Sequence, residues 1–112
     1  MIFVSSMKVH SDVGGRPYTE DDPTQPSDAY GISKLRAEQA LAEVHAESDL
    51  ATVILRPPLA YGPGVKAHFG TLLRHADSSL PLPLGGIDQN RSSYLYLGNL
   101  LSAVRKVLSE PA

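Results

Sequence analysis

The chain has 112 residues, a formal net charge of −2 and no cysteine. A chain of this length is expected to form one domain at most. The weak negative charge argues against nucleic acid or an anionic membrane surface as the main partner. The missing cysteine excludes a disulfide framework, a thiolate nucleophile and a cysteine-based zinc site, and it is compatible with a cytoplasmic protein.

An apolar stretch over residues 2–4 predicts a buried strand that leads directly into Ser5 and Ser6. Residues 10–28 follow and are rich in glycine, proline and acidic side chains, which predicts a long polar loop. Loops of this length in compact domains are usually functional or disordered.

A helix is expected from about Ala29 to His45, with Ser27 or Asp28 as its N-terminal cap. Its apolar residues recur at helical spacing and form one stripe, made of Leu35, Ala37, Ala40, Leu41 and Val44. We therefore expect this stripe to face the core.

The remaining elements expected in chain order are a strand over 52–55, a turn over 61–64, a short helix over 68–75, an extended segment over 80–86, a strand over 94–97 and a helix over 100–108. The alternation of strands and helices predicts an α/β fold with a parallel sheet. No apolar run approaches the roughly 20 residues that span a bilayer, so no membrane partner is expected. A sheet of three strands leaves apolar edges unpaired, which indicates a part of a larger fold.

Tyr30 and Lys34 lie one turn apart near the start of the expected helix, so their side chains share a face. A phenol loses its proton only near about pH 10, and a cation beside it favours the phenolate. The pair thus suits proton transfer near neutral pH, with a serine hydroxyl from another element orienting the substrate oxygen. Taken alone, the same spacing also fits a half-buried tyrosine and a solvated lysine that pairs weakly with Glu38.

Three motifs together carry a family resemblance: Ser5-Ser6, the Tyr30-Gly-Ile-Ser-Lys34 segment, and Leu-Arg-Pro-Pro-Leu-Ala-Tyr-Gly-Pro-Gly over 55–64. The chain resembles extended short-chain dehydrogenase/reductases, in the NAD-dependent nucleotide-sugar epimerase/dehydratase group and its UDP-glucose 4-epimerase-like branch. This resemblance implies a partial Rossmann-like, doubly wound parallel sheet. Residues 1–64 would carry the catalytic segment and 65–112 part of the nucleotide-sugar region.

The resemblance also implies roles for particular residues. Tyr30 would remove a proton from a sugar hydroxyl while hydride passes to NAD. Lys34 would promote the phenolate and bind the nicotinamide ribose, and Ser6 would hydrogen-bond the reacting oxygen. Pro57 and Pro58 would lie against the nicotinamide, although they also fit simple termination of a strand.

Three later residues are implied in substrate binding. Arg91 would reach the nucleotide diphosphate, because a guanidinium suits paired phosphate oxygens. His68 would lie beside the phosphates and Leu84 beside the base, but each also fits a structural role. Leu59 stands where many 4-epimerases place an asparagine, and Gly98 replaces a frequent acidic residue, so the sugar stays open. The histidines show no metal-binding spacing, and no metal is expected.

The 112 residues contain no G-x-x-G-x-x-G loop, and the glycine pair at 14–15 does not open a helix. We therefore expect a truncated segment that is inactive alone, whose full-length form uses NAD and a nucleotide-sugar substrate and can form a homodimer. The alternatives are a nucleotide-sugar 4-keto reductase or dehydratase of surface polysaccharide synthesis, and a non-catalytic remnant.

Overall fold

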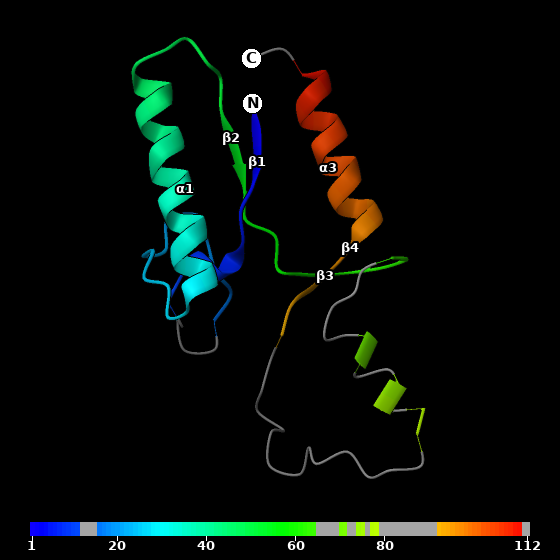
Figure 1. The fold of residues 1–112 in the computed structure, drawn as a ribbon. Coiled ribbons are helices and arrows are strands. Elements are labelled where there is room, and N and C mark those ends of the chain that lie inside the picture. Colours follow the sequence, from blue (N-terminus) through cyan, green and yellow to red (C-terminus); the bar gives the residue numbers. More distant parts are fainter. Residues whose placement is uncertain (12–15, 65–69, 72–73, 76, 79–91, 111–112) are drawn as a thin grey trace.

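The structure is a computed structural model that describes residues 1–11, 16–64, 70–71, 74–75, 77–78 and 92–110. Its elements in chain order are β1 (Ile2–Val4), the 3-10 turn η1 (Met7–Val9), α1 (Ala29–Ala46), β2 (Val53–Leu55), β3 (Leu59–Tyr61), β4 (Tyr94–Tyr96) and α3 (Leu97–Ser109). In Figure 1, α1 and α3 stand on either side of β1 and β2.

The strands of the described residues form two separate parallel pairs. β1 pairs with β2, with Val4 opposite Leu55, and β3 pairs with β4. The parallel pairing and the mixture of helices and strands confirm the expected partial Rossmann-like α/β class. The expectation that all strands share one sheet is wrong. Pro57 and Pro58 have no N–H to continue the β2 ladder, so the chain leaves that sheet and starts β3 at Leu59.

The expected cap of α1 is confirmed, because Asp28 Oδ1 accepts the Gly31 N–H at 2.7 Å. The expected apolar stripe is only partly correct. The buried residues of α1 are Gly31 and Glu38, whereas Val44 is exposed. The covered face of α1 is therefore set by its contacts with η1 and with the Arg56 side chain that follows β2. The spacing of its apolar residues does not determine that face.

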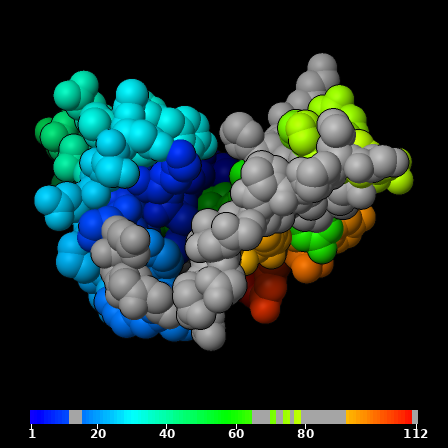
Figure 2. Space-filling model, turned by 90° about the horizontal axis from the view of Figure 1, so that it is seen from below, coloured from blue at the N-terminus to red at the C-terminus, as the bar shows by residue number. Residues whose placement is uncertain are grey.

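Little apolar surface is buried within the described residues, where Val9 is the one fully buried hydrophobic side chain. Large hydrophobic residues are exposed on both strand pairs and on α3: Val4, Val53, Leu59, Tyr94, Tyr96, Leu101 and Leu108. Seen from below, β1, η1 and the start of α1 gather on one side, and β4 with the start of α3 on the other (Figure 2). This exposure agrees with the unpaired apolar edges expected from the sequence.

The last third of the chain is described in part. Of the helix expected over 68–75, residues 70–71 and 74–75 are helical; the rest, and the expected extended segment over 80–86, lie outside the described residues. α3 begins three residues earlier than expected, at Leu97, and its N-cap Tyr96 makes no side-chain cap bond. No helix in the described ranges has the length and apolar character needed to cross a membrane.

Candidate functional site

The candidate site lies at the carboxyl ends of β1 and β2, which is where ligands bind in open parallel sheets. Two backbone hydrogen bonds join the segments that follow these strands: the Ser5 N–H donates to the Leu55 carbonyl at 2.7 Å and the Met7 N–H to the Pro57 carbonyl at 3.1 Å. These two bonds flank Ser6 and fix its backbone beside Pro57.

Ser5 and Ser6 have different surroundings. Ser5 is 3% exposed, and its hydroxyl lies near the Glu38 carboxylate without a hydrogen-bond partner in the described part of the chain. Ser6 is half-buried and caps η1, where its Oγ accepts the Lys8 N–H at 3.2 Å. Of the two hydroxyls, that of Ser6 is the more accessible to a substrate.

Tyr30 and Lys34 come together on the first turns of α1. The Lys34 Nζ lies 5.8 Å from the centroid of the Tyr30 ring and donates to the Val4 carbonyl at 3.0 Å. It also lies 5.1 Å from the centroid of the Phe3 ring. Tyr30 is 52% exposed. One ammonium thus sits between an accessible phenol and the strand end that leads into Ser6, although the Ser6 hydroxyl bonds within its own turn rather than to Tyr30.

The remaining expected site residues divide into two groups. Pro57 and Pro58 follow β2 at its carboxyl end, as the sequence indicated, and both are half-buried. His68, Leu84 and Arg91 lie outside the described residues. Their roles in binding a nucleotide sugar stay predictions.

A charged cluster lies under α1 beside this site. Both carboxylate oxygens of Glu38 bind the Arg56 guanidinium, with Nη2–Oε2 at 2.7 Å and Nε–Oε1 at 3.1 Å. Glu38 is 4% exposed. Burial raises its pKa, but the hydrogen bonds and charge of Arg56, together with the nearby Ser5 hydroxyl and His10, outweigh burial and leave the pKa below its usual value. The alternative in which Lys34 pairs weakly with Glu38 at the surface is therefore not what the structure shows, because Glu38 pairs with Arg56.

His10 joins this cluster from the end of η1. It is 7% exposed, and its ring bonds to Arg56 and to the Asp22 carbonyl. Asp22 in turn accepts hydrogen bonds from Arg16 and from the Thr19 N–H. The loop over 16–22 is thus attached to the end of the turn that Ser6 begins.

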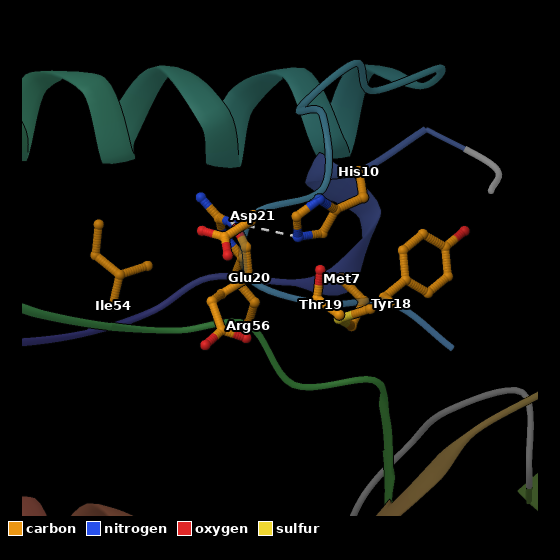
Figure 3. A pocket seen from close by; sticks show the side chains of 8 residues that line it. All are labelled: Met7, His10, Tyr18, Thr19, Glu20, Asp21, Ile54 and Arg56. Carbon is orange, nitrogen blue, oxygen red and sulfur yellow. Dashed lines mark hydrogen bonds between the residues drawn. The ribbon is translucent and has the colours of Figure 1, made fainter. Parts of the chain in front are cut away.

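A cavity of about 450 Å³ opens at this cluster (Figure 3). Side chains from η1 and its C-terminal cap, from the loop, and from β2 and the residue after it line this cavity: Met7, His10, Tyr18, Thr19, Glu20, Asp21, Ile54 and Arg56. The Tyr18 ring lies 5.7 Å from the His10 ring, centroid to centroid. In the described ranges, no three histidine or acidic side chains gather in a way that could hold a metal ion.

Arg56 and His10 were not predicted as site residues, and the burial of Glu38 was not expected. Strand alternation carries a signal for Arg56, because residues two apart on a strand share a face. Arg56 therefore lies on the same face of the strand as Ile54, the face toward α1. A guanidinium buried there needs a carboxylate as its partner. Glu38 lies seven residues after the buried Gly31 and so shares its helix face.

Comparison with known proteins gives the family. The model of the NAD dependent epimerase/dehydratase family matches residues 1–112. The chain is 39% identical to UDP-glucose 4-epimerase of Vibrio cholerae, over 98% of this chain and 34% of that protein. It is 30% identical to spore coat polysaccharide biosynthesis protein SpsK of Bacillus subtilis, over 98% and 37%. It is 27% identical to dTDP-4-dehydro-6-deoxyglucose reductase of Escherichia coli, over 92% and 34%.

The chain thus spans about a third of the length of these curated relatives. No solved structure gives a significant match. The family match covers every residue of the chain and agrees with the resemblance carried by its motifs. The chain belongs to the NAD-dependent epimerase/dehydratase family.

Proposed function

We propose that these residues form the catalytic segment of an NAD-dependent nucleotide-sugar epimerase, which inverts a hydroxyl-bearing carbon as a UDP-glucose 4-epimerase does. The observation that carries the proposal is the placement of the Lys34 ammonium, 5.8 Å from the Tyr30 ring centroid and hydrogen-bonded to Val4 at the end of β1. The relative that is 39% identical bears the name of that activity.

The residues at this edge fit the nicotinamide-ribose end of NAD. An ammonium has three hydrogen-bond donors, and the Val4 carbonyl takes one from Lys34, which leaves donors for ribose hydroxyls. Pro57 and Pro58 offer an apolar surface at the carboxyl end of β2. When bound, NAD supplies the hydride chemistry and the protein supplies binding and orientation. The pyrophosphate would need a glycine-rich loop, which these 112 residues do not contain.

The chain's own residues then handle the proton. Ser6 Oγ accepts the Lys8 N–H, so its hydroxyl hydrogen stays available to donate to a sugar oxygen. The accessible Tyr30 side chain, in its phenolate form, takes the proton of the sugar hydroxyl, and the phenol so formed later returns that proton. Lys34 offsets the negative charge of the phenolate, which is present before the proton is taken and again after it is returned. Proton transfer by a positioned side chain of this kind contributes about 10²–10⁴-fold to a rate.

A 4-keto reductase or dehydratase of surface polysaccharide synthesis is the second candidate. It is supported by the 27% identity to dTDP-4-dehydro-6-deoxyglucose reductase and by Leu59, which stands where many 4-epimerases have asparagine. The same Tyr30 and Lys34 would then give a proton to a ketone oxygen instead of removing one from an alcohol.

Product analysis separates the candidates. The native polypeptide that carries these residues is given UDP-glucose, UDP-galactose and a dTDP-4-keto-6-deoxy sugar in turn, with NAD or NADPH. An epimerase converts each UDP-hexose into a mixture of both epimers without consuming reduced cofactor. Net reduction of the keto sugar, with no epimerisation of the UDP-sugars, would refute the epimerase. We expect the 112-residue segment alone to show negligible turnover, and the cytoplasmic location and the homodimer remain predictions.

A further inference from the structure

The Arg56 guanidinium connects three parts of the chain at one point. Its Nε and Nη2 bind Glu38 on α1, its Nη1 contacts His10 Nε2 at 3.2 Å, and the same Nη1 donates to the Glu20 carbonyl at 3.3 Å. The Arg56 side chain is 24% exposed. A largely buried guanidinium that makes two hydrogen bonds to one carboxylate has a well-defined position. Arg56 can therefore support the His10 ring that it contacts.

The two ring nitrogens of His10 have roles that their partners fix. A guanidinium can only donate, so Nε2 accepts from Arg56. The Asp22 carbonyl can only accept, so Nδ1 carries the ring hydrogen and donates to it at 3.0 Å. His10 thereby makes two directional contacts, one through each ring nitrogen.

His10 is also the C-terminal cap of η1, whose N-terminal cap is Ser6. The turn has few bonds of its own: Val9 N–H to the Ser6 carbonyl at 3.2 Å and His10 N–H to the Met7 carbonyl at 3.1 Å. Short 3-10 turns of this kind have poorer hydrogen-bond geometry than α-helices and depend on outside anchors. The backbone hydrogen bonds of Ser5 and Met7 hold its first end, and the Arg56–His10 contact holds its last.

We propose that His10 is a positioning residue, which holds the Ser6 turn at a fixed place against the catalytic helix through its contact with Arg56. This proposal rests on the proposed role of Ser6 as the hydroxyl that binds the sugar oxygen. Arg56 and Glu38 are poor choices for a test, because removing either leaves a mostly buried charge unpaired and endangers the fold. His10 can be changed while that ion pair stays intact.

Three variants of His10 in the native polypeptide separate its two contacts. In His10→Gln the side-chain carbonyl lies near the place of Nε2 and can accept from Arg56. In His10→Asn the side-chain amide lies near the place of Nδ1 and can donate to the Asp22 carbonyl only. His10→Phe keeps the ring volume and loses both contacts. Tyr96→Phe, on the other strand pair, serves as the control for a change in an unrelated ring.

Two readouts are taken for each variant: kcat and KM for the nucleotide sugar, and hydrogen exchange of the Met7 and Val9 amides. We expect His10→Phe and His10→Asn to lower kcat about tenfold or more with KM little changed, since a hydrogen bond to a charged group is worth about that factor. The Val9 amide should exchange faster in the same two variants. His10→Gln should recover most of both losses, and Tyr96→Phe should match the wild type.

Unchanged amide exchange in His10→Phe would overturn the proposal, and so would wild-type kcat in a variant whose turn exchanges faster. Recovery by asparagine instead of glutamine would also overturn it, because the anchor would then be Asp22. If the wild-type protein turned over no nucleotide sugar, that result would contradict the proposed function but not the proposed role of His10. The exchange of Met7 and Val9 would then still decide whether His10 holds the turn.

Discussion

Gly31 of α1 lies against the backbone of Lys8 in η1, so closely that a Cβ on Gly31 would be 2.3 Å from the Lys8 carbonyl oxygen and 2.8 Å from the Pro26 Cβ. Real side chains do not approach a carbonyl oxygen this closely, and neither neighbour is the flexible end of a side chain. The first residue after Tyr30 in the motif therefore has a physical requirement: only glycine lets the helix meet the turn that Ser6 begins.

The Gly31→Ala variant is accordingly expected to push α1 away from η1. Overpacking of this kind costs about 1–3 kcal/mol of folding free energy, which outweighs the roughly 1 kcal/mol by which alanine favours a helix over glycine. Urea denaturation of the native polypeptide measures the change. Gly70→Ala is the matched control, because Gly70 is also helical and a Cβ there meets no atom of the described residues within 4 Å. Equal stability of the two variants would contradict the close contact.

Tyr30→Phe removes the proposed proton-transfer group and little else. Because Tyr30 is largely exposed, loss of its hydroxyl should leave the thermal midpoint almost unchanged. Turnover of the nucleotide sugar should fall by about 10²–10⁴-fold. Steady-state rates of this variant and of the Tyr96→Phe control provide the measurement. If the Tyr30→Phe enzyme kept more than half of the wild-type kcat, Tyr30 could not be the proton-transfer group.

The buried pair of Glu38 and Arg56 should dominate the ionic contribution to stability. Glu38→Gln leaves the Arg56 charge without its partner, and such a loss costs about 3–5 kcal/mol, with the lower end expected because Arg56 keeps some solvent contact. The control is Glu110→Gln in the exposed Lys106–Glu110 pair of α3, 3.8 Å apart, whose loss should cost less than about 0.5 kcal/mol. Chemical denaturation of both variants decides whether the two pairs differ.

Asp22 should give the protein a specific sensitivity to acid. The hydrogen bonds of Arg16, the Thr19 N–H and the charge of Arg16 hold the pKa of Asp22 at about 2. Since the folded pKa lies below the unfolded value of about 3.9, the stabilisation is complete above that pH and is lost as pH falls from about 4 to about 2. The thermal midpoint of Asp22→Asn should therefore depend less on pH across that window. Parallel curves for the variant and the wild type would contradict this.

Local patterns in the sequence predicted much of the fold. The apolar runs and the capping Asp28 correctly indicated β1, α1, β2 and the strand at Tyr94. The short strand β3 was missed, because its three residues lie between a proline pair and a Gly-Pro-Gly turn and have no room for a strand pattern. The last helix was predicted to start at residue 100, three residues too late. The true start at Leu97 has no sequence signal, because its N-cap Tyr96 supplies no polar capping side chain.

The candidate site was predictable only where its residues form a local motif. Tyr30 and Lys34 are one turn apart on one helix, so their proximity follows from helix geometry. The Glu38–Arg56 pair joins residues 18 apart on different elements, and the His10–Arg56 contact joins residues 46 apart. Their pairing depends on the strand register and on the approach of α1 to η1, which no local pattern encodes.

Deuterium at C4 of UDP-glucose labels the carbon whose inversion the proposed function requires. Incubated with the native polypeptide and NAD, the labelled sugar should give UDP-galactose that still carries deuterium at C4, because the hydride removed from that carbon is returned to it. NMR spectroscopy of the product shows both the configuration and the label. The predicted result is inversion at C4 with the deuterium retained. In the Tyr30→Phe variant this inversion should be abolished. Inversion with loss of deuterium to water, or no inversion by a folded native protein, would contradict the account.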